Sequence, residues 1–498
     1  MTKTQLEGPI MNIIYYTQSF PFFRLIMLLM GFALIWALPA FALDGQIRIH
    51  DPSTIMLCNG KYYTYGTGGT SLVSDDGWTW RRGVTPARRG MAPDVIHVGD
   101  RYYMYISSNP GGQPHSQVIM ISTKSLDPES PDYKWEDGGI VNSTDGVEFC
   151  NGIDPGLFLD PTDGKLWMTF GSYFGYIRLV ELDPKTGKRV DDKFTNIAIN
   201  CEASTIIYHE GWYYLLATHG SCCRGTDSGY NIRVGRSKKV TGPYIDHTGL
   251  DMIQGGGKLV IGSGGRVVGA GHFGLLDLGD GVQKFSLHWE ADMDRGNASV
   301  LDIRPLLWKD GWPVAGYNVK EGTYEIESVR TGTALELAVE GVPVGGRRSR
   351  GVRGMFGGVG GVIPPQDVNQ VSANWPEGNV DIRMANYMCQ AQQKWTVTPV
   401  ADDGGYPGSP YFKITIAGTD RTLAVGEDGE LVALSAFTGG HEQLWRIDQL
   451  TDGTWRIMPK FASIAKESLT LSAIGSSFAT LARFNPAGDK QRWLFKTP

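Results

Sequence analysis

A two-part pattern recurs along the first 320 residues of the chain and limits what it can fold into. A short polar motif begins at positions 51, 94, 154, 202 and 272, and a segment of the form Gly-x-aromatic-aromatic follows about ten residues after each. The segments read GKYYTYGTG (60–68), GDRYYMYISS (99–108), GKLWMTFGS (164–172), EGWYYLLAT (210–218) and, in a degraded copy, GVQKFSLHW (281–289). The motif starts are 43, 60, 48 and 70 residues apart, which is typical of one four-stranded blade per repeat. Five such units predict a five-bladed β-propeller.

The composition favours the same all-β fold class. The chain has 66 glycines among 498 residues, 11% aromatic residues and 20% charged residues. Abundant glycine and aromatic residues with modest charge are typical of short strands joined by tight turns. These values exclude a disordered chain and a long coiled coil, and the formal charge of −6 implies no broad basic surface for nucleic acid.

The equivalent position of every blade in a propeller points at one central axis. We therefore expect the polar residues that begin the five motifs to surround one funnel. They are Asp51, Asp94, Asp154, Glu202 and His272. Carboxylates are costly to bury unless they are paired, so such a ring has no packing purpose. The alternative is that the acidic residues and the neighbouring prolines only cap turns between blades.

Three of these carboxylates suit the hydrolysis of a glycosidic bond. One carboxyl must stay protonated to donate to the leaving oxygen, while another must be ionised to activate water. A third nearby carboxylate raises the pKa of the acid by like-charge repulsion. Asp51, Asp154 and Glu202 supply this set.

Several segments between residues 44 and 318 carry a family resemblance. They are HDPS, NGIDPGLF, CEAST, SCCRGTDSGYNIRVGRSKKVTGPY, GAGH and LDIRPLLW. They resemble arabinan endo-1,5-α-L-arabinosidases of glycoside hydrolase family 43, which are five-bladed propellers that invert the anomeric centre. The resemblance implies that Asp51 is the general base, that Glu202 is the general acid, and that Asp154 orients the acid and tunes its pKa. Inversion predicts base and acid carboxyls about 6.5–9.5 Å apart.

The resemblance also concerns His272, which matches a family histidine that faces a central ion, usually calcium, largely through water. Calcium prefers oxygen ligands, so a lone histidine is an unusual direct ligand. The chain reads Gly271-His272-Phe273-Gly274 where the family more often has Gly-His-Asn-Ser. The alternative is a buried histidine that is hydrogen-bonded to the backbone.

Aromatic residues are expected to line a sugar cleft, because the apolar faces of sugars stack on rings. Phe174, in GSYFGY, lies where the family often has a tryptophan and is the predicted platform. The loop that begins at Asn109, Asn-Pro-Gly-Gly, follows the second repeat and is predicted to shape the cleft.

The pattern changes after residue 314. Three Gln-x-Trp triplets begin at Gln393, Gln443 and Gln491, 50 and 48 residues apart. Three near-equal units predict pseudo-threefold symmetry, in which each tryptophan packs a shared core and each glutamine holds a turn. They resemble the ricin-B-type β-trefoil of carbohydrate-binding modules. We expect this domain either to bind plant cell-wall polysaccharide or to serve as a packed appendage. An insertion with four arginines (345–365) is either a contact for acidic pectin or a solvated loop.

The N-terminus predicts export. Residues 25–42 form an uncharged apolar run that follows Arg24 and ends in Ala40-Phe41-Ala42, a pattern typical of a secretory signal cleaved after Ala42. The alternative is an uncleaved membrane anchor. Export permits disulfides, and the adjacent Cys222 and Cys223 are either bonded to each other or packed as two thiols.

These observations predict a secreted or periplasmic protein with a signal peptide (1–42), a five-bladed catalytic propeller (43–318) and a β-trefoil (319–498). The predicted activity is inverting hydrolysis of α-1,5-linked L-arabinan, and the predicted partners are arabinan or arabino-oligosaccharides. We expect no nucleic-acid partner, and no membrane association after signal cleavage. The alternatives are an exo-acting arabinofuranosidase or a β-xylosidase on the same propeller, and a non-catalytic carbohydrate-binding protein.

Overall fold

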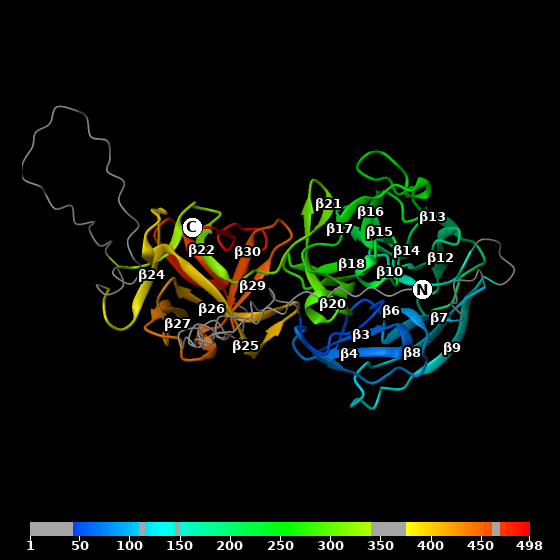
Figure 1. Ribbon diagram of the computed structural model, residues 1–498, viewed down its shortest axis with the longest axis horizontal. Coiled ribbons are helices and arrows are strands. Elements are labelled where there is room, and N and C mark those ends of the chain that lie inside the picture. Colours follow the sequence, from blue (N-terminus) through cyan, green and yellow to red (C-terminus); the bar gives the residue numbers. More distant parts are fainter. Residues whose placement is uncertain (1–42, 109–114, 145–149, 340–374, 461–468) are drawn as a thin grey trace, which may run out of the picture. The chain divides into compact units, whose positions relative to one another are not determined.

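The computed structural model describes residues 43–108, 115–144, 150–339, 375–460 and 469–498. The predicted signal peptide, Asn109 and the arginine-rich insertion lie outside the described residues. Among the described residues, no helix is long and apolar enough to cross a membrane. Strands dominate the fold (Figure 1). The 3-10 helices are single turns: η2 (Thr67–Gly69), η3 (Gly225–Asp227), η4 (Met252–Gln254), η5 (Met293–Arg295), η6 (Ala391–Gln393) and η7 (His441–Gln443).

The N-terminal part is a five-bladed β-propeller, as predicted, and each blade is a sheet of consecutive antiparallel strands (Figure 1). The first blade also pairs its last strand in parallel with β1. The first blade contains β1 (Asp44–Gly45), β2 (Met56–Cys58), β3 (Lys61–Gly66), β4 (Thr70–Ser74) and β5 (Thr79–Arg82), and the second contains β6 (Met91–Val98), β7 (Arg101–Ser108), β8 (Gln117–Thr123) and β9 (Glu136–Ser143). The third contains β10 (Gly156–Leu159), β11 (Leu166–Phe170), β12 (Tyr176–Leu182) and β13 (Thr195–Ile199), and the fourth contains β14 (Glu202–His209), β15 (Trp212–His219), β16 (Asn231–Ser237) and β17 (Lys258–Ile261). The fifth contains β18 (Val267–Asp277), β19 (Gln283–Asp292), β20 (Ala298–Lys309) and β21 (Trp312–Ala315).

The repeated Gly-x-aromatic-aromatic segments are the turn and the second strand of a blade. In the first blade Asn59 and Gly60 link β2 to β3 with φ angles of 50° and 76°, as a two-residue hairpin turn with left-handed residues requires. Glu210 and Gly211 link β14 to β15 in the same way, with φ angles of 46° and 79°. The glycine therefore sets the turn, and the aromatic residues that follow enter the packed strand.

The apolar cores of the propeller lie between neighbouring blades rather than at its centre. The second strands contribute fully buried aromatic rings to these cores, such as Tyr105 and Tyr214. One core cluster joins residues of the first and second blades, another the second and third, and another the third and fourth. Because each sheet is apolar on both faces, the centre of the ring is left for polar side chains.

Contacts of the residues before the first blade close the ring. The amide of Leu301 donates to the carbonyl of Ile47 at 2.9 Å, and the amide of Ile49 donates to the carbonyl of Ser299 at 3.3 Å. Ile47 and Ile49 are buried in one core cluster with residues of the fourth and fifth blades. The segment before the first blade is thereby fixed against β20 of the last blade.

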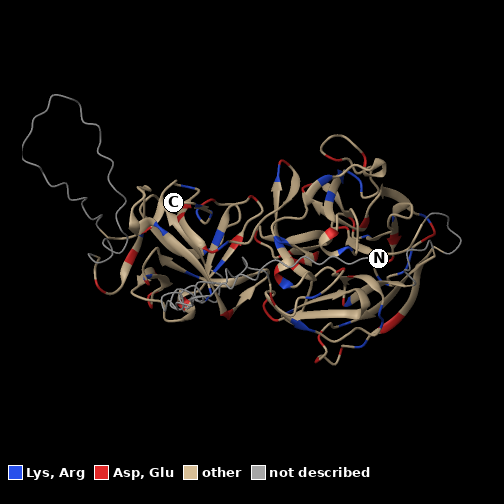
Figure 2. Ribbon diagram, in the orientation of Figure 1, with Lys and Arg blue, Asp and Glu red and all other residues tan. Residues whose placement is uncertain are grey.

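The C-terminal part is a large β-sheet of twelve strands around one apolar core (Figure 1). Charged residues of both signs are spread over the described ribbon in both parts (Figure 2). The strands are β22 (Gly322–Ser328), β23 (Ala334–Leu337), β24 (Val380–Ala385), β25 (Trp395–Tyr406), β26 (Ser409–Ile416), β27 (Thr422–Val425), β28 (Leu431–Leu434), β29 (Trp445–Gln449), β30 (Trp455–Pro459), β31 (Leu469–Ile474), β32 (Phe478–Arg483) and β33 (Trp493–Lys496).

The three Gln-x-Trp units make equivalent contacts in this sheet. Trp395, Trp445 and Trp493 are fully buried in the same core. Their indole N–H groups donate to the carbonyls of Leu335, Leu423 and Leu471, at 2.8, 2.9 and 3.0 Å. Each glutamine side chain donates to a nearby carbonyl and accepts from a nearby amide, and so holds a turn. The three units therefore share one arrangement.

We expect Trp445→Ala to destabilise the C-terminal sheet by about 3–5 kcal/mol, because it removes a fully buried ring and leaves the carbonyl of Leu423 unpaired. The measurement is urea unfolding followed by circular dichroism. Phe478→Ala is the matched control, because Phe478 is 68% exposed. A loss for Trp445→Ala no larger than that of the control would contradict the anchoring role.

Candidate active site

A left-handed residue recurs in every blade, either within the inner strand or shortly before it. Asp51, Asp154 and His272 have φ angles of 53°, 54° and 57°, and Ala92 and Ala203 have φ angles of 41° and 47°. Aspartate and histidine tolerate this region better than most residues, although it is still unfavourable. Three of the inner strands, β6, β14 and β18, also have irregular register at this point. Such irregularities re-aim side chains beside active sites.

The five predicted residues do not occupy equivalent positions in their blades, because only Asp51, Asp154 and His272 are themselves the left-handed residue. Glu202 precedes the left-handed residue of its blade, whereas Asp94 follows that of its own blade by two positions. Asp94 accepts from the amide of Thr54 at 2.9 Å and from the amide of Leu157 at 2.8 Å. It therefore ties the first and third blades together, and its two carboxylate oxygens are occupied by backbone amides.

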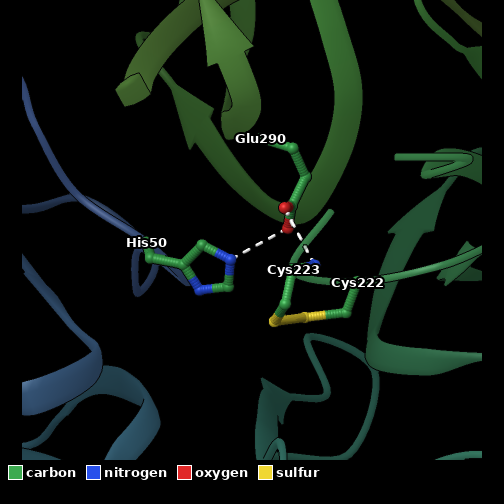
Figure 3. Close-up of side chains that lie close together, drawn as sticks. All are labelled: His50, Cys222, Cys223 and Glu290. Carbon is green, nitrogen blue, oxygen red and sulfur yellow. Dashed lines mark hydrogen bonds and ion pairs between the residues drawn. A yellow bond between two sulfur atoms is a disulfide. The ribbon is translucent and has the colours of Figure 1, made fainter. Parts of the chain in front are cut away.

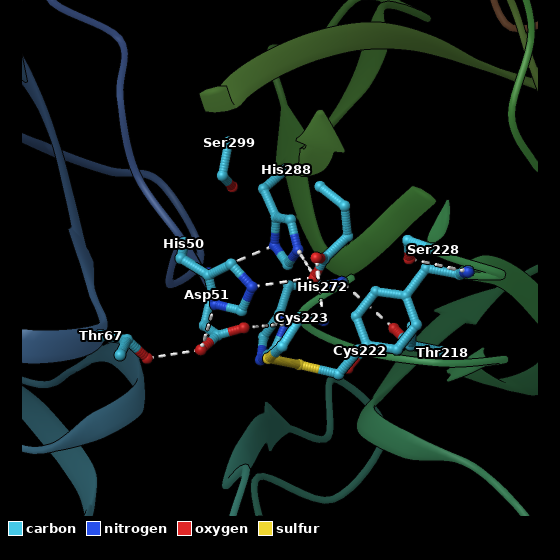
Figure 4. Close-up of polar contacts among 12 residues, drawn as sticks. His50, Asp51, Thr67, Thr218, Cys222, Cys223, Ser228, His272, His288 and Ser299 are labelled. Atoms are coloured by element: carbon cyan, nitrogen blue, oxygen red, sulfur yellow. Dashed lines mark hydrogen bonds and ion pairs between the residues drawn. A yellow bond between two sulfur atoms is a disulfide. The ribbon is translucent and has the colours of Figure 1, made fainter. Parts of the chain in front are cut away.

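Asp51 is buried beside three histidines, His50, His272 and His288 (Figure 4). Its Oδ2 is 2.8 Å from His50 Nδ1 and accepts from the Thr67 hydroxyl, and its amide donates to His288 Nδ1 at 3.2 Å. Burial raises the pKa of Asp51, but His272, His50 and His288 outweigh burial and hold it well below its usual range. Asp51 is therefore a carboxylate at neutral pH.

Close backbone packing brings Thr67 to Asp51. The Thr67 amide donates to the His50 carbonyl at 3.0 Å. A Cβ at the preceding Gly66 would lie 2.6 Å from that same carbonyl oxygen, so a larger residue would push the two segments apart.

Glu202 has the opposite protonation tendency. Burial raises its pKa to about 7, and the negative charges of Asp51 and Glu290 add to this effect. The Tyr230 hydroxyl donates to Glu202 Oε1, and this hydrogen bond lowers the pKa. Glu202 therefore carries a proton over a large part of the neutral range.

Asp154 is placed next to Glu202. Its Oδ2 accepts from the amide of Ala203 at 3.2 Å, and its own amide donates to Ser107 Oγ at 3.0 Å. Burial, together with the charges of Glu202 and Asp51, raises the pKa of Asp154 well above its usual range. The Asp154–Glu202 pair therefore retains a proton where isolated carboxyls would both ionise.

Sequence reasoning missed several polar residues of the site. Tyr230 contacts the predicted acid, and His50 contacts the predicted base. Glu290 accepts from His50 Nε2 at 2.8 Å and lies 3.3 Å from His288 Nε2. His50 stands beside Asp51 in the HDPS motif, which was a usable signal, whereas nothing in the sequence relates Glu290 to the first blade.

His272 lies at the axis, as predicted. Its Nδ1 is 3.2 Å from Asp51 Oδ1 but is not aligned for a hydrogen bond, and both ring nitrogens are buried without a hydrogen-bond partner in the described part of the chain. Burial lowers the pKa of His272 to about 4. The ring also lines a small axial cavity of about 20 Å³ together with Asp94 and Asp154. A polar cavity of this size holds about one water molecule.

Two exposed aromatic rings lie in the connection that precedes β12. The predicted platform Phe174 is 43% exposed in the connection between β11 and β12. The neighbouring Tyr173 is 41% exposed, and its hydroxyl donates to the carbonyl of Thr218 at 3.5 Å. Thr218 is the β15 partner of Glu202, so Tyr173 stands next to the acid.

The adjacent Cys222 and Cys223 form a disulfide (Figure 3). Of the other cysteines, Cys58, Cys150 and Cys201 are buried and free, and Cys389 is exposed and free. Of the two predicted states of these cysteines, the structure therefore contains the disulfide and not two thiols. The disulfide lies beside His50 and Glu290.

Known proteins are similar to this chain over the propeller. Residues 63–313 match the Glycosyl hydrolases family 43. The chain is 36% identical over 304 residues to an extracellular exo-α-(1→5)-L-arabinofuranosidase of Cellvibrio japonicus, which covers 54% of this chain and 86% of that protein. It is 31% identical over 291 residues to an extracellular endo-α-(1→5)-L-arabinanase of Bacillus subtilis, covering 53% and 87% of the two chains.

Solved structures are similar over the same part. An exo-1,5-α-L-arabinanase from a bovine ruminal metagenomic library is 35% identical, with a TM-score of 0.51, over 56% of this chain and 100% of that one. A Cellvibrio cellulosa α-L-arabinanase complexed with arabinohexaose is 33% identical, with a TM-score of 0.51, over 54% and 96% of the two chains. The chain belongs to glycosyl hydrolases family 43 and is a glycoside hydrolase.

Proposed function

We propose that this enzyme hydrolyses α-1,5-linked L-arabinan with inversion at the anomeric carbon. Asp51 is the general base that takes a proton from the attacking water. Glu202 is the general acid that protonates the leaving oxygen, and Asp154 orients Glu202 and raises its pKa. The partners are arabinan and arabino-oligosaccharides.

The opposed protonation of two carboxyl groups carries this proposal. Hydrolysis with inversion needs one ionised and one protonated carboxyl on opposite sides of the scissile bond. The pKa of Asp51 is held well below its usual range, and that of Glu202 is raised to about 7. The two groups therefore hold the required states at the same neutral pH.

Arabinan is favoured as the substrate because of what the similar proteins are named for. The similar proteins include both an exo-arabinofuranosidase and an endo-arabinanase. Phe174 and the neighbouring Tyr173 are suitable platforms for a furanose ring, because both rings are exposed and Tyr173 stands next to Glu202. The alternative of a non-catalytic carbohydrate-binding protein is excluded, because the chain belongs to a family of glycoside hydrolases.

The product profile on linear arabinan tests the substrate and separates the modes of action. Mixed oligosaccharides from the first minutes mean endo action, and a single product from the start means exo action. Rapid cleavage of aryl xylosides with no attack on arabinan would overturn the proposal in favour of a β-xylosidase.

We expect Asp51→Asn and Glu202→Gln each to lower kcat on arabinan by about 10²–10⁴-fold, because each removes a proton-transfer group. The measurement is the initial rate of reducing-sugar release. Asp100→Asn is the control, since Asp100 pairs with Lys124 on the surface, with the Asp100 side chain 71% exposed. A catalytic variant that retains more than about a tenth of the wild-type rate would contradict its role.

We expect Tyr230→Phe to move the alkaline limb of the pH profile of kcat to higher pH. Activity needs protonated Glu202, so it falls as the pH rises through a pKa of about 7. The hydrogen bond from Tyr230 stabilises the ionised form, and its loss raises that pKa. If the alkaline limb stays in place or moves to lower pH in the variant, the ionisation of Glu202 does not determine that limb.

A calcium ion near His272 is part of the proposal. The buried, unpaired ring nitrogens of His272 fit a partner that the protein itself does not supply, and a largely water-mediated ion suits a single histidine better than direct ligation. A bound cation would stabilise the neighbouring Asp51 carboxylate. We expect about one calcium per chain by elemental analysis, lost in His272→Ala. Wild-type protein without metal, or an unchanged metal content in the variant, would contradict the site.

We further propose that the C-terminal sheet is a β-trefoil that binds plant cell-wall polysaccharide, and that the protein is secreted or periplasmic. The equivalent contacts of Trp395, Trp445 and Trp493 support the trefoil. The extracellular location named for two similar proteins supports export.

A further inference from the structure

A chain of short contacts links the Cys222–Cys223 disulfide to His50 (Figure 3) and on to Asp51 (Figure 4). The Cys223 amide donates to Glu290 Oε2 at 2.9 Å. The other oxygen, Oε1, is 2.8 Å from His50 Nε2, and His50 Nδ1 is 2.8 Å from Asp51 Oδ2. Each contact involves a different atom, so the position of each group depends on the one before it.

His50 is held between two carboxylates. Each of its ring nitrogens faces a carboxylate oxygen, which can only accept, so both nitrogens carry a proton. Burial lowers the pKa of His50, but the hydrogen bonds to Asp51 and Glu290 outweigh burial and raise it to about 10. The ring is therefore an imidazolium whose orientation is fixed from both ends.

Glu290 also holds His288, the second histidine of the site. His288 Nδ1 accepts from the Asp51 amide, so the proton of this ring is on Nε2, which lies 3.3 Å from Glu290 Oε1. Glu290 is only 5% exposed, and three donors converge on its carboxylate. Glu290 Oε1 therefore contacts both His50 and His288.

The disulfide restrains the Cys223 amide, which is the donor to Glu290 at the exposed end of these contacts. Cys223 has a left-handed backbone with a φ of 63°, which is unfavourable for a cysteine, and the disulfide closes a ring through the peptide bond that joins it to Cys222. Cys223 is exposed, so a small thiol can reach it. Opening the ring frees this backbone to leave the left-handed region and withdraw the amide from Glu290.

We propose that Glu290 is a positioning residue that fixes His50 against Asp51, and that the Cys222–Cys223 disulfide keeps Glu290 in place, so that turnover requires the oxidised form. This inference rests on the proposed role of Asp51 as the base. Neither Glu290 nor the disulfide takes part in bond making. They act by holding the carboxylate where it meets the attacking water.

The first test is reversible reduction. Dithiothreitol transfers two electrons and two protons to the disulfide, closes to its own cyclic disulfide and leaves two thiols at Cys222 and Cys223. We expect kcat on arabinan to fall by about 10²-fold with little change in KM, because a displacement of about 1 Å at a reacting group has this effect. Removal of the reductant and reoxidation restore kcat, and peptide mass spectrometry follows the bond.

Two variants control the reduction. The double variant Cys222→Ser with Cys223→Ser is expected to have the kcat of the reduced wild type, and dithiothreitol is expected not to change that kcat. Cys389→Ser removes the exposed free cysteine of the C-terminal sheet and is expected to respond as the wild type does. A double variant with wild-type kcat would overturn the role of the disulfide.

The second test is Glu290→Gln. A glutamine puts a donating NH2 group in place of one carboxylate oxygen, so either the Cys223 amide at Oε2 or His50 at Oε1 loses its acceptor, and we expect kcat to fall by about 10²-fold with KM nearly unchanged. Glu290→Asp keeps the carboxylate and is expected to recover part of kcat. Glu136→Gln removes only a surface ion pair with Arg101 and is the matched control. Thermal unfolding checks that each variant is folded.

The outcomes separate this inference from the proposed function. If the wild-type enzyme releases no sugar from arabinan, the proposed function is contradicted. An active wild type whose kcat responds neither to reduction nor to Glu290→Gln overturns the inference alone. A rise in KM at constant kcat also overturns it, because Glu290 or the disulfide would then act by binding substrate.

Discussion

Repulsion between carboxylates gathered at one axis is the constraint on which the active site depends. Asp51, Asp154 and Glu202 are all largely buried, and three buried anions so close together could not coexist without compensation. The protein divides them into two groups. His50 neutralises Asp51, while Asp154 and Glu202 are left to share a proton. The opposed protonation states of these carboxyl groups are therefore set by which carboxylate receives the cation.

The backbone places these groups before their charges can act. Asp51, Asp154 and His272 are left-handed residues of three blades and lie within the inner strand or shortly before it. The unfavourable conformation is maintained by the strands that follow and by contacts such as that between the Asp154 amide and Ser107. Blade repetition thus brings residues from distant parts of the sequence to one axis.

Much of this arrangement could be predicted from the sequence, because the signals were periodic. The recurring turn glycines and aromatic strands predicted five blades, and the polar motifs between them identified Asp51, Asp154 and Glu202. Asp94 lines the axial cavity, but it stands two residues after the left-handed position of its blade, a shift that a pattern with gaps does not reveal. His50 stood next to Asp51 but had no predicted role. Glu290 could not be found, since its contact with His50 spans 240 residues and exists only once the ring is closed.

Ring closure and the support of Asp51 depend on the same junction. Ile47 and Ile49 pair with Leu301 and Ser299 of the last blade, and the next residue along the chain is His50. Its partner Glu290 comes from β19 of that same blade. A propeller that opened between its last and first blades would separate Glu290 from His50 and leave Asp51 without its imidazolium. The apolar and backbone contacts that close the ring therefore also maintain the charge state of Asp51, so the stability of the fold and the ionisation of this carboxylate cannot vary independently at this junction.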